Sequence, residues 1–207
     1  MSDSISRREL LKAAGIAGAA AIVRAEAFPP AIEPAQAPET LTSSEYETVQ
    51  AIFSRIVPSD ENGPGAIEAQ AARYIDRAMG GALASIRPAY SAGIAAVDAY
   101  ARASMGASFA RLSATDQDAV LTDMQENRAT GFMPDSESFF NLVRAHAIQG
   151  TFSDPFYGGN AGFTGWDLIG YPGVRTAVSA NQQRMDVKVT PNHRSAYDFG
   201  MFSKGEL

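Results

Sequence analysis

The sequence predicts a mainly α-helical protein: a compact bundle of about five helices with one long, irregular, glycine- and aromatic-rich loop near the C-terminus. Apolar residues recur at spacings of three and four through most of residues 43–150, which is typical of amphipathic helices. Capping residues, prolines and glycines separate these stretches. No run of alternating apolar and polar β-branched residues bounded by turns predicts a competing strand.

The first 27 residues have the pattern of a twin-arginine export signal. Arg7 and Arg8 stand in SRRELLK and precede a mild apolar run from Ala13 to Val23, which is far short of the ~20 residues needed to span a bilayer. The alternative is a basic amphipathic helix of the mature fold. Polar residues do not recur through the run, however, so such a helix would have no polar face. We therefore expect export to the periplasm by the twin-arginine translocase.

Two small-x-small sites could be cut, at residues 25–27 and at residues 35–37. We favour cleavage after Ala27, because a proline follows the second site. Residues 28–40 are rich in proline and alanine without an apolar period, which predicts an extended tether. Residues 41–207 then form one small domain.

The first helix is expected after Ser43 or Ser44, either of which can cap it, and it must end by Val57 because Pro58 follows. Its apolar face has spacings of three, four and seven: Tyr46, Val49, Ile52, Phe53 and Ile56. The second helix ends at the glycine pair 80–81. Its inward residues are Ile67, Ala71, Tyr74, Ile75 and Ala78.

The third helix is predicted from about Arg87 to Met105, with Pro88 tolerated in its first turn. Ser113 and Asp116 form a variant of the capping box and open the fourth helix.

The fifth helix is introduced by Pro134 and Asp135 and is expected to fray out at Gly150. It carries His146 on its apolar face, where a histidine is more often a hydrogen-bonded core residue than a general base. His193 lies in a polar segment with no supporting motif.

The composition of the chain excludes binding sites for most cofactors. It has no cysteine and two histidines, which excludes disulfides, thiolate metal sites and multi-histidine metal sites. No glycine-rich phosphate-binding motif occurs, and the net charge of −6 disfavours nucleic-acid binding. Because an export route for folded proteins usually serves a cofactor-bearing cargo, we expect the cofactor to lie in a partner.

Residues 151–173, TFSDPFYGGNAGFTGWDLIGYPG, hold six glycines, six aromatic residues and the only tryptophan. Asp154, Asn160 and Asp167 could be oxygen ligands for calcium, but their spacing does not match an EF-hand loop. We favour the alternative that Asp154 and Asn160 bond neighbouring backbone amides and lock the turns.

The aromatic residues of this loop allow two interpretations. Phe156, Phe163 and Trp166 could form a small core that covers the helix ends. The many glycines favour a surface that a partner approaches closely, where Trp and Tyr tend to be energetic anchors. The two interpretations are compatible.

A rival hypothesis is a stand-alone periplasmic enzyme or sugar-binding protein that uses this loop. Its pocket would be lined by Tyr157, Trp166, Asp167 and His146. A third possibility is a purely structural envelope protein.

The run DPFYGGN at 154–160, GW at 165–166 and IGYPG at 169–173 resembles the gluconate 2-dehydrogenase subunit 3 family. The resemblance implies a small subunit without a redox centre. Its large partner would be an FAD-binding dehydrogenase of the glucose–methanol–choline type, exported with it as folded cargo, and a cytochrome c subunit joins some such complexes. The expected interface residues are Asp154, Phe156, Tyr157, Gly158, Gly159, Asn160, Trp166, Tyr171, Pro172 and Gly173.

Overall fold

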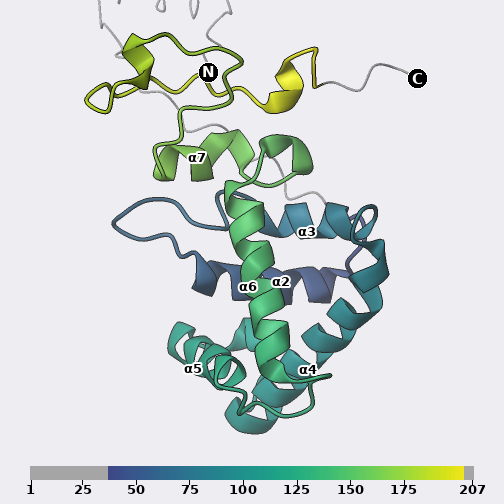
Figure 1. Ribbon diagram of the computed structural model, residues 1–207. Coiled ribbons are helices and arrows are strands. Elements are labelled where there is room, and N and C mark those ends of the chain that lie inside the picture. Colours follow the sequence, from purple (N-terminus) through teal and green to yellow (C-terminus); the bar gives the residue numbers. More distant parts are fainter. Residues whose placement is uncertain (1–36, 203–207) are drawn as a thin grey trace, which may run out of the picture. The chain divides into compact units, whose positions relative to one another are not determined.

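The structure is a computed structural model and describes residues 37–202 of the 207 (Figure 1). The predicted leader, including Arg7, Arg8 and Ala27, lies outside the described residues. Within them the regular elements are helices, joined by short 3₁₀ turns. The α-helices are α2 (Ser43–Ile56), α3 (Ala71–Met79), α4 (Arg87–Met105), α5 (Ala114–Gln125), α6 (Ser136–Phe152) and α7 (Thr164–Leu168).

The helix α6 is the centre of the arrangement. It contacts α2, α3 and α5 along its length and α7 near its C-terminal end, and Figure 1 shows it crossing in front of α2 and α3. Its inward residues Phe139, Val143 and Ala147 join the common core. No helix among the described residues is long and apolar enough to cross a membrane.

Helix α2 begins with a full capping box. The Thr42 hydroxyl accepts from the amide of Glu45 at 3.3 Å, and the Glu45 carboxylate accepts from the amide of Thr42 at 2.8 Å. Arg87 and Ser91 of α4 also donate to this carboxylate. Burial alone would raise the pKa of Glu45, but hydrogen bonds from Arg87, Ser91 and Thr42 lower it from 4.5 to about 2, so Glu45 joins α2 to α4 as an anion.

The backbones of α3 and α6 meet with no side chain between them. A Cβ atom at Gly150 would lie 2.4 Å from the carbonyl oxygen of Ala71, which is closer than real Cβ atoms approach an oxygen. At the other end of α6, a Cβ at Gly93 of α4 would lie 2.1 Å from the Phe139 ring. Glycine at each position therefore allows a crossing that alanine would force apart.

All five predicted helices begin or end as the local signals indicated. Helix α3 ends at Met79, directly before the glycine pair. Helix α2 ends at Ile56 and α4 spans Arg87–Met105 with its proline in the first turn. Ser113 accepts from the amide of Asp116 at the start of α5, and Asp135 accepts from the amide of Ser138 at the start of α6.

Four details of the sequence prediction were wrong. Helix α2 is capped by Thr42, and the predicted caps Ser43 and Ser44 are its first two residues. Helix α3 starts only at Ala71, because Gln70 has a left-handed φ of 52°, and Ile67 is 45% exposed instead of facing inward. Helix α6 continues past Gly150 to Phe152, since this glycine is needed for close packing and does not end the helix. The loop that follows is not wholly irregular, because it contains α7.

We expect Gly150→Ala to destabilise the protein by about 2 kcal/mol, because overpacking costs ~1–3 kcal/mol and here the obstacle is backbone. Urea unfolding measures the change. The matched control is Gly81→Ala, where a Cβ would meet nothing within 4 Å; its free energy of unfolding should change by no more than about 0.5 kcal/mol. Equal effects of the two substitutions would contradict the close crossing.

Candidate functional site

The glycine- and aromatic-rich loop is locked to the end of α6 by Asn160, which is fully buried. The Asn160 side-chain amide donates to the carbonyl of Ser153 at 2.8 Å, and its carbonyl oxygen accepts from the amides of Gly165 at 2.8 Å and Trp166 at 3.4 Å. Its own backbone amide donates to the carbonyl of Gly150 at 2.8 Å. The predicted locking role of Asn160 is confirmed, and it also connects α6 to α7.

Asp154 has the predicted local bond and two that the sequence did not reveal. Its carboxylate accepts from the amide of Phe156 at 3.0 Å, as a turn-locking aspartate should. It also accepts from the Ser195 hydroxyl at 2.6 Å and from the amide of Ala196 at 2.8 Å. Asp154 therefore fastens a segment 41 residues further along the chain to the loop.

Two of the loop glycines let its backbone lie directly on α6. A Cβ at Gly159 would be 2.0 Å from the carbonyl oxygen of Gly150, and one at Gly165 would be 1.9 Å from that of Thr151. Gly158 has a φ of 100° and lies against the Arg77 side chain of α3. The glycine content thus serves internal packing as well as turns.

Trp166 belongs to a small core under the loop. It is 5% exposed, and its indole nitrogen donates to the carbonyl of Phe152 at 2.8 Å. Tyr171 and Phe163 contact it, with ring centroids 4.8 Å and 5.4 Å away. The small-core interpretation is therefore correct for Trp166, and its indole serves packing within this chain.

Other aromatic residues of the loop form an exposed group, which we call the aromatic patch and define as Phe156, Tyr157 and Tyr197. Phe156 is 53% and Tyr157 is 47% exposed. The ring of Tyr197 stacks on Phe156 with centroids 3.6 Å apart, and the hydroxyl groups of Tyr157 and Tyr197 are 2.7 Å apart. The three rings hold one another in place while remaining open to solvent.

The predicted interface residues consequently fall into two sets. Phe156 and Tyr157 are exposed in the patch, and Tyr171 is 39% exposed beside Trp166. The other seven residues hold the loop in place or pack within it, and they contact other parts of this chain. They are Asp154, Gly158, Gly159, Asn160, Trp166, Pro172 and Gly173. A contact with a partner remains a prediction, and it applies most directly to the exposed set.

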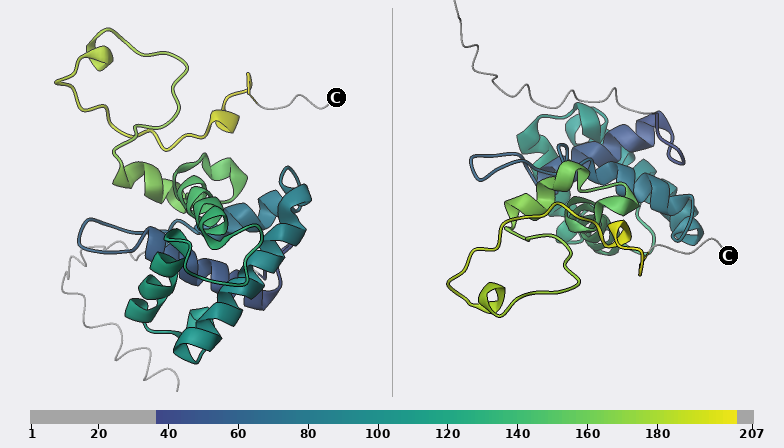
Figure 2. Two further views of the ribbon diagram at one scale, coloured as in Figure 1. Left: turned by 60° about the horizontal axis from the view of Figure 1, so that its bottom comes forward. Right: turned by 90° about the horizontal axis from the view of Figure 1, so that it is seen from above.

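Tyr197 belongs to the C-terminal arm, residues 174–202, which the sequence analysis did not connect to the site. The base of the arm is closed by hydrogen bonds between Val174 and Arg194 and between Asn192 and Val174. Between these points the chain forms a wide loop that stands away from the helices (Figure 2). The capping box at Ser195 and Asp198 was a local clue to ordered structure here.

The four residues of the rival pocket lie in separate settings. His146 is 6% exposed and packs against Tyr90, with ring centroids 5.6 Å apart; burial lowers its pKa, so it is held neutral in the core. Asp167 pairs with His193 at 2.8 Å, with both side chains about half exposed. Tyr157 is in the patch and Trp166 in the small core, so the structure does not assemble this pocket.

A shallow cleft of about 380 Å³ lies between α7 and the turn before α3, lined by Asn62, Pro64, Thr164, Asp167 and Leu168. Among the described residues there is no group of three or more His, Cys, Asp or Glu side chains that could hold a metal ion. The most distinctive exposed feature of the loop is the aromatic patch.

The chain matches a known protein family. The family model described as gluconate 2-dehydrogenase subunit 3 matches residues 43–173, which cover α2 to α7 and the entire locked loop. The C-terminal arm follows the matched range. Searches of the curated proteins and of the solved structures gave no match.

We expect Asp154→Ala to release the C-terminal arm. Hydrogen bonds to a charged group contribute ~1.5–3 kcal/mol each, and a loss of 1.4 kcal/mol raises an open population about tenfold. Limited proteolysis should therefore cut the arm next to Ser195 and Ala196, the two residues that Asp154 holds, at least about ten times faster, by the same relation, while residues 41–152 stay protected. The control Asp186→Ala removes a carboxylate that pairs with Arg184 within the projecting loop. Unchanged arm cleavage in Asp154→Ala would show that this carboxylate does not hold the arm.

Proposed function

The chain belongs to the gluconate 2-dehydrogenase subunit 3 family, and from this membership we propose that it binds, stabilises and exports a large FAD-dependent dehydrogenase subunit. Family membership makes it an accessory subunit of a dehydrogenase complex. The proposed partner is of the glucose–methanol–choline type and oxidises a sugar, polyol or glycoside. The complex would lie in the periplasm, and a cytochrome c subunit could carry its electrons to a membrane acceptor.

The observation that carries the proposal is the aromatic patch. Phe156 and Tyr157 expose about half of their surface although both are large and apolar. Their rings are fixed by Tyr197 and by the turn that Asp154 locks, so little side-chain freedom would be lost on binding. Rigid exposed aromatic residues are the usual energetic anchors of protein interfaces.

The remaining chemistry of the chain supports an accessory role. It has no cysteine, no glycine-rich nucleotide motif and two histidines, of which His146 is buried in the core. The residues present do not suit a flavin or haem, so we assign the flavin to the partner. A subunit that binds only the folded partner stabilises it by mass action and couples its export to its folding.

Truncation of the patch tests the docking step. Phe156→Ala should weaken association with the large subunit by at least about tenfold, since interface anchors contribute more than ~1.4 kcal/mol. The amount of large subunit retained on the tagged chain measures this. Met133→Ala is the matched control, because Met133 is 90% exposed and precedes the N-terminal end of α6. If Phe156→Ala instead lowers the free energy of unfolding and leaves association intact, the patch is not the docking surface.

Substitution of the arginine pair tests the export step. With Arg7→Lys and Arg8→Lys together, both subunits should remain in the cytoplasm, because the large subunit would depend on the leader of the small one. Cell fractionation and dehydrogenase activity in the periplasm measure the outcome. The proposal fails if the large subunit still reaches the periplasm while the small subunit stays behind.

A further inference from the structure

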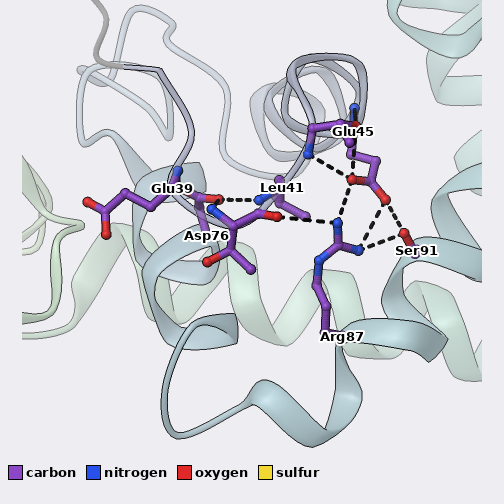
Figure 3. Close-up of polar contacts among 8 residues, drawn as sticks. Glu39, Leu41, Glu45, Asp76, Arg87 and Ser91 are labelled. Atoms are coloured by element: carbon purple, nitrogen blue, oxygen red, sulfur yellow. Dashed lines mark hydrogen bonds and ion pairs between the residues drawn. The ribbon is translucent and has the colours of Figure 1, made fainter.

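The start of the described chain is held by Asp76, an aspartate on the inward side of α3 that is 2% exposed. Its carboxylate accepts three backbone amides in succession: Glu39 at 2.6 Å, Thr40 at 2.9 Å and Leu41 at 2.7 Å. Figure 3 shows Asp76 beside Glu39 and Leu41, with the bond from the Leu41 amide drawn as a dashed line. We call this arrangement the Asp76 clasp.

Other contacts fix the same short run. The Leu41 side chain is 4% exposed in the core, and the Thr40 side chain lies against Gly80, where a Cβ would be 2.9 Å from the Thr40 hydroxyl oxygen. The Arg87 guanidinium donates to the Thr40 carbonyl at 3.4 Å and is itself held by Glu45 (Figure 3). Residues 39–41 are therefore bound through their amides, a carbonyl and a buried side chain.

The clasp lies beside one of the two possible signal-peptidase sites. Cleavage after Ala37 would break the bond to Pro38, and Glu39 is the second residue after that bond. Peptidases bind extended backbone through main-chain hydrogen bonds, but the amides of Glu39 and Thr40 are already bonded to Asp76. Access to this site thus requires residues 39–41 to open first.

We propose that the Asp76 clasp selects the processing site: it holds residues 39–41, just after the bond between Ala37 and Pro38, away from a peptidase in the folded chain, so the leader is removed after Ala27. This inference rests on the proposed export of an already folded chain, because only then does the peptidase meet the closed clasp. Residues 28–38 then remain on the mature protein as an N-terminal extension that ends at the clasp.

The first test is the N-terminus of the mature protein in its complex, determined by sequencing and intact mass. The inference predicts a single N-terminus at Phe28. An N-terminus at Pro38 would overturn the clasp inference and leave the export proposal standing. An unprocessed chain that stays in the cytoplasm would overturn the export proposal, and the clasp inference with it.

A second test separates the clasp from the proline that follows the bond. In the full-length precursor, Ala27→Leu blocks the first site and Pro38→Ala removes the proline. This double variant should stay uncut after Ala37, because Asp76 still holds residues 39–41. Efficient cleavage there would overturn the inference.

Asp76→Asn added to that background keeps one carbonyl acceptor and removes the charge and the second acceptor oxygen. At least about half of the chain should then be cut after Ala37, since weaker hydrogen bonds raise the open population. Circular dichroism and retained binding of the large subunit establish that this variant is folded. Complete protection in a folded Asp76→Asn variant would show that something other than the clasp closes the site.

Discussion

The structure depends on a single point at which three stretches of backbone meet without side chains between them. At Gly150 of α6, the absent Cβ lets Ala71 of α3 approach from one side, while the Gly150 carbonyl accepts the amide of Asn160 and lies under Gly159. Main-chain atoms can approach this closely only where a glycine leaves out the Cβ atom. It sets the distance between the helical core and the loop, and every later feature of the loop is positioned from it.

From that point the loop is built outward by polar side chains. Asn160 satisfies the backbone at the end of α6 and at the start of α7, which seats the Trp166 indole over the Phe152 carbonyl. The Asp154 carboxylate then binds the backbone of the C-terminal arm at Ala196. The next residue, Tyr197, stacks on Phe156. An exposed apolar surface results whose rings are held by contacts within the chain, which is what the proposed docking surface requires.

Local signals in the sequence predicted the helices well, because a cap or a proline acts within a few residues. Ser113 shows this at the start of α5. The cap of α2 is Thr42, one residue before the first of the two predicted serines, so the local signal placed this helix correctly to within two residues. What the sequence did not predict arises from long-range pairing. The partners of Asp154 and Asp76 are 41 and 37 residues away, and no spacing rule identifies them. An aspartate next to Ile75 on an inward helix face was a usable clue, because a buried carboxylate needs several donors.

The central claim is that this chain works by holding a flavin-bearing dehydrogenase subunit. The most direct measurement is the absorption spectrum of the complex obtained by purifying the tagged chain from its native host, together with the sizes of the copurifying polypeptides. The account predicts one flavin per complex, bound to a larger polypeptide and absent from the isolated chain, which lacks a nucleotide-binding motif. Recovery of the chain by itself, folded and without flavin, from cells that make the dehydrogenase would contradict it.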